Sequence, residues 1–272
     1  MKLAAIQPFV TADKERNIET ALRLIAESAR GGAQMAVLPE MFFCPIDFGL
    51  FPKYAEPAGG AAWQAMSDAA KQNGLWLVAG SMPETGEGGE IYNSCFVFAP
   101  DGSCAARHRK MHLYDVDIEG GTRFMESESV TPGSEVTVFD TPFGRFGVVV
   151  CFDIRYPELF RLTVDAGAEA IIIPAVFNMS TGPLHWELTC RARAVDNQVY
   201  TVGCAPARNE ALSYVPYANS LVCSPWGEVT ARLGTEEGIL YTDIDFAEVQ
   251  KVREQLPLLK LRRQDVYTLR LN

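Results

Sequence analysis

The stretch Phe146-Gly-Val-Val-Val150-Cys151-Phe152-Asp153 decides the fold. Its apolar run predicts a buried strand, and the thiol of Cys151 follows directly where that strand ends. A strand that carries a nucleophile at its tip and then turns toward a helix is how α/β enzymes present a reactive side chain. Most cysteines are small core residues, so the interpretation of Cys151 depends on the rest of the chain.

Strands and helices alternate on both sides of this run, which is typical of an α/β fold. Asp13 can cap one of these helices, whose apolar face is predicted from Ile18, Leu22, Ile25, Ala26 and Ala29. The predicted helices cover 13–30, 61–73, 157–166, 185–196 and 246–254. The predicted strands cover the first residues of the chain, 35–38, 75–79, 94–98, 105–109, 136–140, 146–150, 170–173, 199–204, 218–223, 228–232 and 239–244.

One segment of the chain echoes another. The stretch from Gly32 to Phe42, GAQMAVLPEMF, resembles the stretch from Gly167 to Phe177, GAEAIIIPAVF. Each reads as a helix end, a buried strand, a proline and a loop, which predicts two sheets related by a rough pseudo-symmetry. Because no linker rich in Gly, Ser or Pro divides the chain, we expect a single domain over 1–272. Within this domain, residues 258–272 are predicted to form a C-terminal arm that could dock on a partner subunit.

Composition excludes several classes of function. The net charge is −10 and the longest basic run is Arg107-His-Arg-Lys110, so nucleic acid is not an expected partner. No apolar stretch has the length of a membrane span, and no secretory segment is recognised at the start. The seven cysteines have irregular spacing without Cys-x-x-Cys, which favours a reducing cytoplasm over disulfides or zinc. Because the chain has only three histidines, a histidine-rich metal site is not expected. We expect neither a metal nor a cofactor.

Three polar residues follow predicted strands, where α/β proteins gather their active sites. They are Glu40, Lys110 and Cys151. Taken singly, they would be a solvated acid, a solvated strand end and a core thiol. Together they form a chemical set, because a thiol nucleophile needs a base for its proton and a cation for the oxyanion it creates.

These residues lie in motifs that resemble a known family. Leu-Pro-Glu40, Arg-Lys110-Met-His-Leu and Val-Cys151-Phe-Asp-Ile-Arg resemble the Glu-Lys-Cys motifs of the nitrilase (carbon–nitrogen hydrolase) superfamily. The stretches 177–187 and 191–200 resemble its omega-amidase branch. The resemblance implies an α-β-β-α sandwich of two mixed sheets flanked by helices, and a homodimer or higher homo-oligomer.

The resemblance also implies roles for the site residues. Cys151 would be the nucleophile, Glu40 the general base, and Lys110 the oxyanion stabiliser, joined by the backbone N–H of Phe152. The reaction would be hydrolysis of a linear amide through a thioester, with release of ammonia.

A second glutamate is expected in the site. The segment Phe124-Met-Glu126-Ser resembles the family's Phe-x-Glu-Ser form, which makes Glu126 an accessory carboxylate that orients Lys110 or the substrate. The alternative is a solvated loop acid beside Glu128.

The histidines are interpreted as structural. His185 is predicted at the start of a helix, where a polar cap or an interface role fits as well as a Cys–His pair. His108 and His112 flank Lys110 and are expected to pack or to form hydrogen bonds.

The substrate is suggested by residues around the nucleophile. Cys-Phe-Asp replaces the Cys-Trp-Glu of true nitrilases, which favours amides over nitriles. The omega-amidase branch hydrolyses α-ketoglutaramate and α-ketosuccinamate, so a pocket for a carboxylate is expected. Its candidate residues are Arg155, Asn178 and Thr181, with Phe42 as a possible apolar wall whose default is core packing. Arg155 could equally brace Asp153 or Glu158.

Other readings stay open. The same three residues could serve a deaminated-glutathione amidase or an N-carbamoyl amino acid hydrolase. Ala218-Asn219-Ser stands where related chains often have Gly-His-Ser, which bears on specificity. A binding protein with a degenerate hydrolase fold is disfavoured because the three catalytic residue types are intact.

Overall fold

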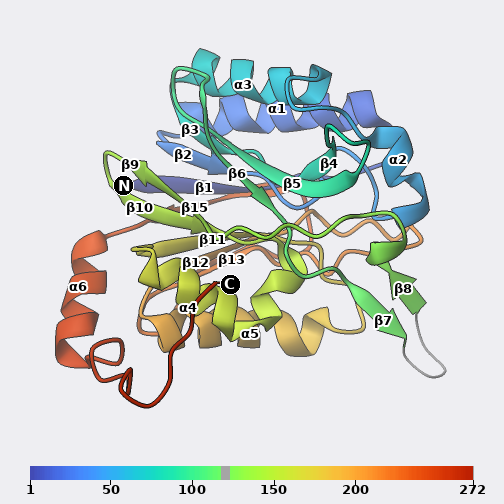
Figure 1. The fold of residues 1–272 in the computed structure, drawn as a ribbon. Coiled ribbons are helices and arrows are strands. Elements are labelled where there is room, and N and C mark those ends of the chain that lie inside the picture. Colours follow the sequence, from blue (N-terminus) through green and yellow to red (C-terminus); the bar gives the residue numbers. More distant parts are fainter. Residues whose placement is uncertain (118–122, 272) are drawn as a thin grey trace.

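Two β-sheets lie face to face, and each carries a pair of helices on its outer face (Figure 1). This computed structural model describes residues 1–117 and 123–271. From one side to the other its layers run helix, sheet, sheet, helix. The predicted α-β-β-α sandwich is confirmed.

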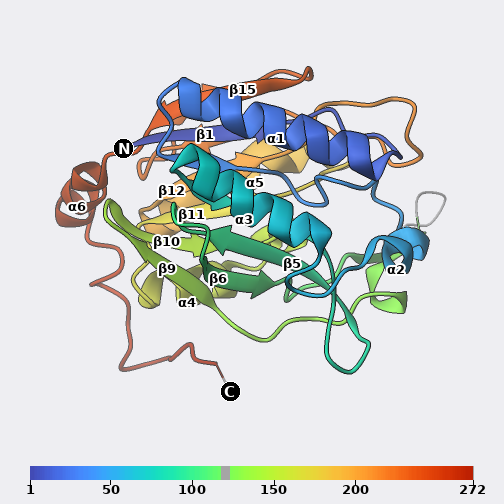
Figure 2. The same ribbon diagram turned by 90° about the horizontal axis from the view of Figure 1, so that it is seen from above.

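The first sheet is built around three parallel strands, β1–β2–β3, with antiparallel strands on both sides. Helices α1 (Lys14–Arg30) and α3 (Ala61–Asn73) cover its outer face, as seen from above in Figure 2. Its strands, in spatial order, are β15 (Gly238–Asp243), β1 (Lys2–Gln7), β2 (Met35–Val37), β3 (Trp76–Val78), β5 (Ile91–Phe98) and β4 (Met82–Thr85), with β6 (Cys104–Arg109) also paired to β5.

The second sheet repeats this plan with β10–β11–β12 as its parallel strands. Helices α4 (Pro157–Asp165) and α5 (Gly182–Asn197) cover it from below in Figure 1. Its spatial order is β14 (Val229–Arg232), β13 (Leu221–Cys223), β12 (Tyr200–Cys204), β11 (Ala170–Pro174), β10 (Gly144–Val148) and β9 (Thr137–Thr141).

The two sheets share one connectivity. The path β1–α1–β2–α3–β3 of the first sheet recurs as β10–α4–β11–α5–β12 in the second. The two echoing segments fall on β2 and β11, the middle strand of each parallel trio. The predicted pseudo-symmetry is therefore confirmed, and it places the loops after β2 and β11 in equivalent positions.

Strand alternation forms two cores. In β1, Leu3 and Ala5 face the second sheet, whereas Ile6 packs toward α1 and α3. Successive side chains of a strand point to opposite faces, and a parallel strand covered on both sides is apolar throughout. The continuous apolar run that introduced this sequence is explained in the same way: β10 lies between the first sheet and α4.

Helix α1 begins as predicted, because the Asp13 side chain accepts a hydrogen bond from Arg16 N. Its predicted buried face is wrong in part. Asn17 is buried because its side chain donates to Phe43 O and accepts from Thr11 N. These bonds satisfy backbone polar groups in two loops. The buried face is therefore rotated, and its residues are Asn17, Ala21, Leu24, Ile25 and Ser28.

The remaining elements are short or peripheral. The sequence did not predict α2 (Phe51–Tyr54), β4 or the hairpin of β7 (Asp115–Asp117) and β8 (Arg123–Met125). After α6 (Phe246–Gln255), residues 257–271 contain no helix or strand, and Arg262 pairs with Asp165 on α4. None of the helices in the described part of the chain is long and apolar enough to cross a membrane.

Candidate active site

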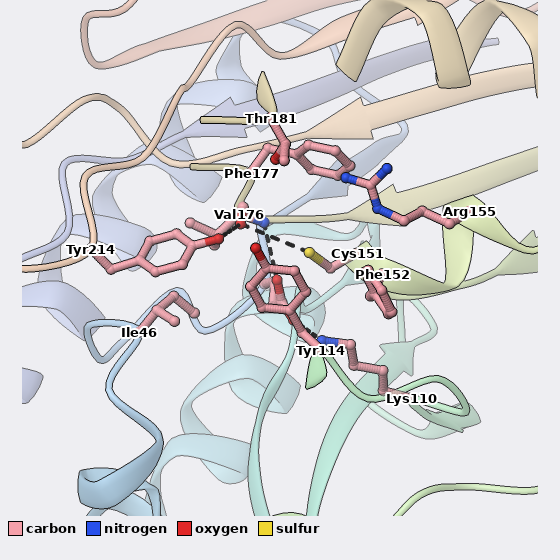
Figure 3. Close-up of a pocket in the computed structure, with 11 residues that line it drawn as sticks. Ile46, Lys110, Tyr114, Cys151, Phe152, Arg155, Val176, Phe177, Thr181 and Tyr214 are labelled. Carbon is pink, nitrogen blue, oxygen red and sulfur yellow. Dashed lines mark hydrogen bonds and ion pairs between the residues drawn. The ribbon is translucent and has the colours of Figure 1, made fainter. Parts of the chain in front are cut away.

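Four strand ends converge on one pocket (Figure 3). Glu40 follows β2, Lys110 follows β6, Cys151 lies three residues after β10, and Val176 follows β11. The pocket offers about 360 Å³ of space, part of it open to solvent. Its lining residues are Glu40, Ile46, Lys110, Tyr114, Cys151, Phe152, Arg155, Val176, Phe177, Thr181 and Tyr214.

Lys110 lies between two carboxylates. Its Nζ is 3.0 Å from Glu40 Oε1 and 2.8 Å from Glu126 Oε2, and all three side chains are buried. Burial by itself would lower the pKa of Lys110, but the two carboxylates raise it well above its ordinary value. The ammonium is therefore charged, and its backbone is fixed by bonds to Asn93 O and from Gly133 N.

Glu126 is a buried member of this cluster rather than a solvated loop acid. It also accepts a hydrogen bond from Tyr114 N at 2.7 Å. Burial raises the pKa of Glu126, with Lys110 opposing the rise. Its geometry fits the role of orienting Lys110.

Glu40 is held on both oxygens. Oε1 accepts from Lys110 and from Asn93 Nδ2 at 2.9 Å, while Oε2 accepts from Val176 N at 3.0 Å. Three N–H donors, from three different segments, therefore hold this carboxylate in place. Sequence reasoning missed Asn93, although a polar residue inside an apolar strand is a detectable signal.

Cys151 has a strained backbone. Its φ of 48° lies in the left-handed region that side chains other than glycine seldom adopt. Burial, and then the neighbouring Glu40, raise the pKa of the Cys151 thiol well above its ordinary value, with Lys110 opposing them. At rest the thiol is therefore protonated and needs a base. Phe152 follows as the second residue of the 3₁₀ turn Cys151–Arg155, where N–H groups have no acceptor within the helix.

Asp153 fixes the turn that carries Cys151. It is fully buried and accepts from Val150 N, from His112 N and ring Nδ1, and from the ring of His108. Burial alone would raise the pKa of Asp153, but the hydrogen bonds to His108 and His112 hold it well below its usual range. Both histidines are thus hydrogen-bonding groups that connect the Lys110 segment to the turn that carries Cys151.

Arg155 lies at the pocket with no carboxylate partner among the described residues. Its Nη1 is 3.2 Å from His185 Nδ1, and its guanidinium carbon is 5.5 and 5.3 Å from the ring centres of Phe152 and Phe177. It braces neither Asp153 nor Glu158. His185 is correspondingly a partner of Arg155 and does not line the pocket.

A family model now connects these features. The model of the carbon–nitrogen hydrolases matches residues 2–254. The chain belongs to the carbon–nitrogen hydrolase family. It is 46% identical over 267 residues to an omega-amidase from Danio rerio, which covers 98% of this chain and 96% of the relative. An omega-amidase from Homo sapiens is 43% identical over 266 residues, with 98% and 96% covered.

Solved structures agree. A member of branch 10 of the nitrilase superfamily from Saccharomyces cerevisiae has a TM-score of 0.89 and is 38% identical, covering 97% of this chain and 96% of its own. The predictions of the superfamily and of its omega-amidase branch are confirmed. The likeness extends over almost the whole of this hydrolase.

Two predicted pocket residues of this hydrolase lie elsewhere. Phe42 packs in the core against Phe43, at 5.2 Å between ring centres, and the same loop places Ile46 at the pocket instead. Asn178 lies behind the wall, where its Nδ2 donates to Tyr114 Oη and its Oδ1 accepts from Thr181 N and Oγ1. Thr181 itself lines the pocket.

Further residues of the pocket were not predicted. Tyr214 donates its hydroxyl to Val176 O at 2.8 Å, and Tyr114 also lines the pocket (Figure 3). Tyr214 comes from a loop without a sequence pattern, whereas Tyr114 belongs to the motif Arg-Lys110-Met-His-Leu-Tyr-Asp. Asn219 does not line the pocket: its Nδ2 donates to Tyr217 O and its backbone carbonyl accepts from Trp186.

Among residues 1–117 and 123–271, no group of three His, Cys, Asp or Glu side chains is placed to hold a metal ion.

Proposed function

We propose that this hydrolase cleaves the C–N bond of a short linear amide that carries a carboxylate, through a thioester on Cys151. The expected substrates are α-ketoglutaramate and α-ketosuccinamate. One observation carries this proposal: Arg155, a cation without a carboxylate partner among the described residues, lines the same pocket as the thiol. The omega-amidases similar to this chain support it.

In the acylation step, Glu40 takes the proton of the Cys151 thiol, and the sulfur attacks the amide carbon. The carbonyl oxygen becomes an oxyanion, which Lys110 and the backbone N–H of Phe152 stabilise. Glu40 then passes the proton to the amide nitrogen, the C–N bond breaks, and ammonia leaves. The high pKa of the thiol is the reason that the base must lie beside it.

In the deacylation step, Glu40 accepts a proton from water as the water oxygen attacks the thioester carbon. The same oxyanion donors stabilise the second tetrahedral intermediate. The C–S bond breaks, the acid leaves, and the proton returns to the sulfur. Glu126 takes no proton in this scheme and keeps Lys110 in place at 2.8 Å.

The far end of the substrate would bind Arg155. Its guanidinium is fixed by His185 and by the rings of Phe152 and Phe177, so little side-chain entropy remains to be lost on binding. Two N–H groups of a guanidinium match the two oxygens of a carboxylate. Thr181 lines the same pocket, but its hydroxyl already donates to Asn178 Oδ1, so Arg155 supplies the donors for the carboxylate.

We further propose a homodimer or higher homo-oligomer in the cytoplasm. Helix α5 exposes apolar side chains, with Leu184 72% and Leu188 64% exposed, and such a face favours a protein partner. All seven cysteines are free, which fits a reducing compartment.

The activity is tested with an ammonia-release panel: α-ketoglutaramate, α-ketosuccinamate, glutamine, deaminated glutathione and an N-carbamoyl amino acid. We expect the two short keto-amides to give the highest kcat/KM. If they are among the poorest substrates, the omega-amidase proposal is wrong. Best activity on deaminated glutathione, or release of carbon dioxide with ammonia from the carbamoyl compound, would identify the alternatives.

The nucleophile is tested in the same assay. Intact-protein mass spectrometry after a brief pulse of the best amide should show one acyl adduct, absent from Cys151→Ala. Cys190→Ala is the matched control, since Cys190 is also buried but belongs to helix α5 and does not line the pocket. An adduct that persists in Cys151→Ala would remove Cys151 from the mechanism.

A further inference from the structure

Asn93 joins the two buried carboxylates of the site through one NH₂ group. Its Nδ2 donates to Glu40 Oε1 at 2.9 Å and to Glu126 Oε1 at 3.2 Å. The side chain comes from β5 and is 1% exposed. Its own backbone carbonyl accepts from Lys110 N at 2.9 Å. Asn93 is therefore within reach of every charged group of the cluster.

The orientation of the Asn93 carboxamide is fixed by charge. Among the described residues, its Oδ1 has no hydrogen-bond partner although it is buried. The inverted amide would place that oxygen against two carboxylates, whereas the NH₂ group donates to both. The orphaned oxygen is thus retained because the alternative orientation repels two negative charges.

The cluster contains more negative than positive charge. Two carboxylates face one ammonium, and all are buried. Lys110 can neutralise only one carboxylate. A buried carboxylate without sufficient donors takes up a proton instead of remaining charged. The NH₂ group of Asn93 supplies one donor to each carboxylate without adding charge.

We propose that Asn93 is a positioning residue that keeps Glu40 and Glu126 ionised together and leaves Glu40 Oε2 free to act on the thiol. Oε1 of Glu40 accepts from Lys110 and Asn93. Oε2 has Val176 N as its one donor in the described part of the chain, so it is the oxygen with remaining capacity. The proposal rests on the proposed role of Glu40 as the base.

Few titratable groups near Glu40 can change their charge below pH 7. The titratable groups that face Glu40 are Lys110, Glu126, Cys151, Tyr214 and Cys44. Burial raises the pKa of both thiols and of the Tyr214 phenol, so these three are neutral near pH 7. The acid limb of the pH profile therefore reports protonation of the carboxylate pair.

The test is the pH profile of kcat/KM in Asn93→Ala and Asn93→Asp, measured with the best amide of the panel. At pH 7 we expect kcat in Asn93→Ala to fall by about tenfold or more, with KM little changed, because a hydrogen bond to a charged group is lost. The acid limb should move to higher pH, and further still in Asn93→Asp, which keeps the shape but adds a third carboxyl group.

The matched control is Ser94→Ala. Ser94 is the next residue of β5, equally buried, and its hydroxyl bonds the carboxylate of Glu84 on the opposite face. Its acid limb should stay in place. An unmoved acid limb in both Asn93 variants, with kcat lowered equally at every pH, would reduce Asn93 to a packing residue. If Asn93→Ala does not fold, Asn93→Asp decides alone. A wild-type protein that releases no ammonia from any amide would instead refute the proposed function.

Discussion

Lys110 shows how one residue decides what the pocket can do. An isolated buried ammonium would lose its proton, but two carboxylates within 3.0 Å keep it charged. In the proposed mechanism, the same ammonium donates a hydrogen bond to the oxyanion formed at the thiol. Arginine would not replace it, because a planar guanidinium is longer and presents its donors in a fixed fork.

Arg155 gives a prediction about substrate choice. Replacing Arg155 by Met should raise KM for carboxylate-bearing amides at least tenfold and leave kcat/KM for a neutral amide such as butyramide within a fewfold, because a charge-assisted hydrogen bond is worth about 1.5–3 kcal/mol. The measurement is the ratio of the two kcat/KM values. His185→Ala is the companion variant and should lower the same ratio less, since the cation remains. An equal loss for both amides would mean that Arg155 does not bind the carboxylate.

At this scale the sequence predicted the residues with chemical motifs and missed those without them. Cys151, Lys110 and Glu40 stand beside recognisable neighbours, and the structure brings them to one pocket. Phe42 was misplaced because the hydrophobic periodicity of a sequence does not predict the direction of a loop such as the one after β2. Tyr214 reaches the site from a loop 63 residues after Cys151, a distance that no local pattern spans.

At the scale of elements, the long helices and buried strands could be predicted because burial imposes a period on them. Helix α3 has the predicted bounds, 61–73. The hairpin β7–β8 could not be predicted, since each strand has three residues, none of them fully buried, and half of the six are charged. The error on α1 has the same origin: Asn17 is buried by its hydrogen bonds, which a hydrophobic pattern ignores.

The turn Cys151–Arg155 gives a prediction about stability. Asp153→Asn should lower the free energy of unfolding at pH 7 by about 2 kcal/mol or more, because an amide NH₂ would face backbone N–H donors. The folded-state pKa of Asp153 is depressed, so its contribution is present above the unfolded value of about 3.9 and is lost as the pH falls below it. Urea unfolding should show a constant difference from pH 7 to 5 that shrinks below about 4. A difference that ignores pH would refute the role of the charge.

At the scale of the whole molecule, the layers place charge and apolar surface on different faces. The buried groups that we propose as catalytic are enclosed where strand ends meet, while α5 exposes Leu184 and Leu188. Exposed apolar side chains on α5 do not stabilise a monomer in water, whereas a protein partner would bury them. The C-terminal residues add further exposed apolar side chains, among them Leu261 and Val266.

The proposed dimer gives a prediction about mass. Leu188→Glu should halve the molar mass measured by light scattering after size exclusion, because a charge would be buried without a partner in the interface. Its circular dichroism should stay as in the wild type, since the side chain is 64% exposed in one chain. A dimer that survives the substitution would place the interface elsewhere, and a monomeric wild type would refute the dimer.

The bond from Val176 N to Glu40 Oε2 spans the two pseudo-equivalent loops, one from each sheet. In the proposed mechanism, neither sheet holds the complete set of catalytic groups. The first sheet supplies the base and the ammonium, and the second supplies the thiol. The rate of turnover should therefore depend on the relative position of the two sheets. As the denaturant concentration rises, the amidase activity should be lost before the far-ultraviolet circular dichroism changes. A small shift of one sheet relative to the other is enough to break the hydrogen bond between Val176 N and Glu40 Oε2.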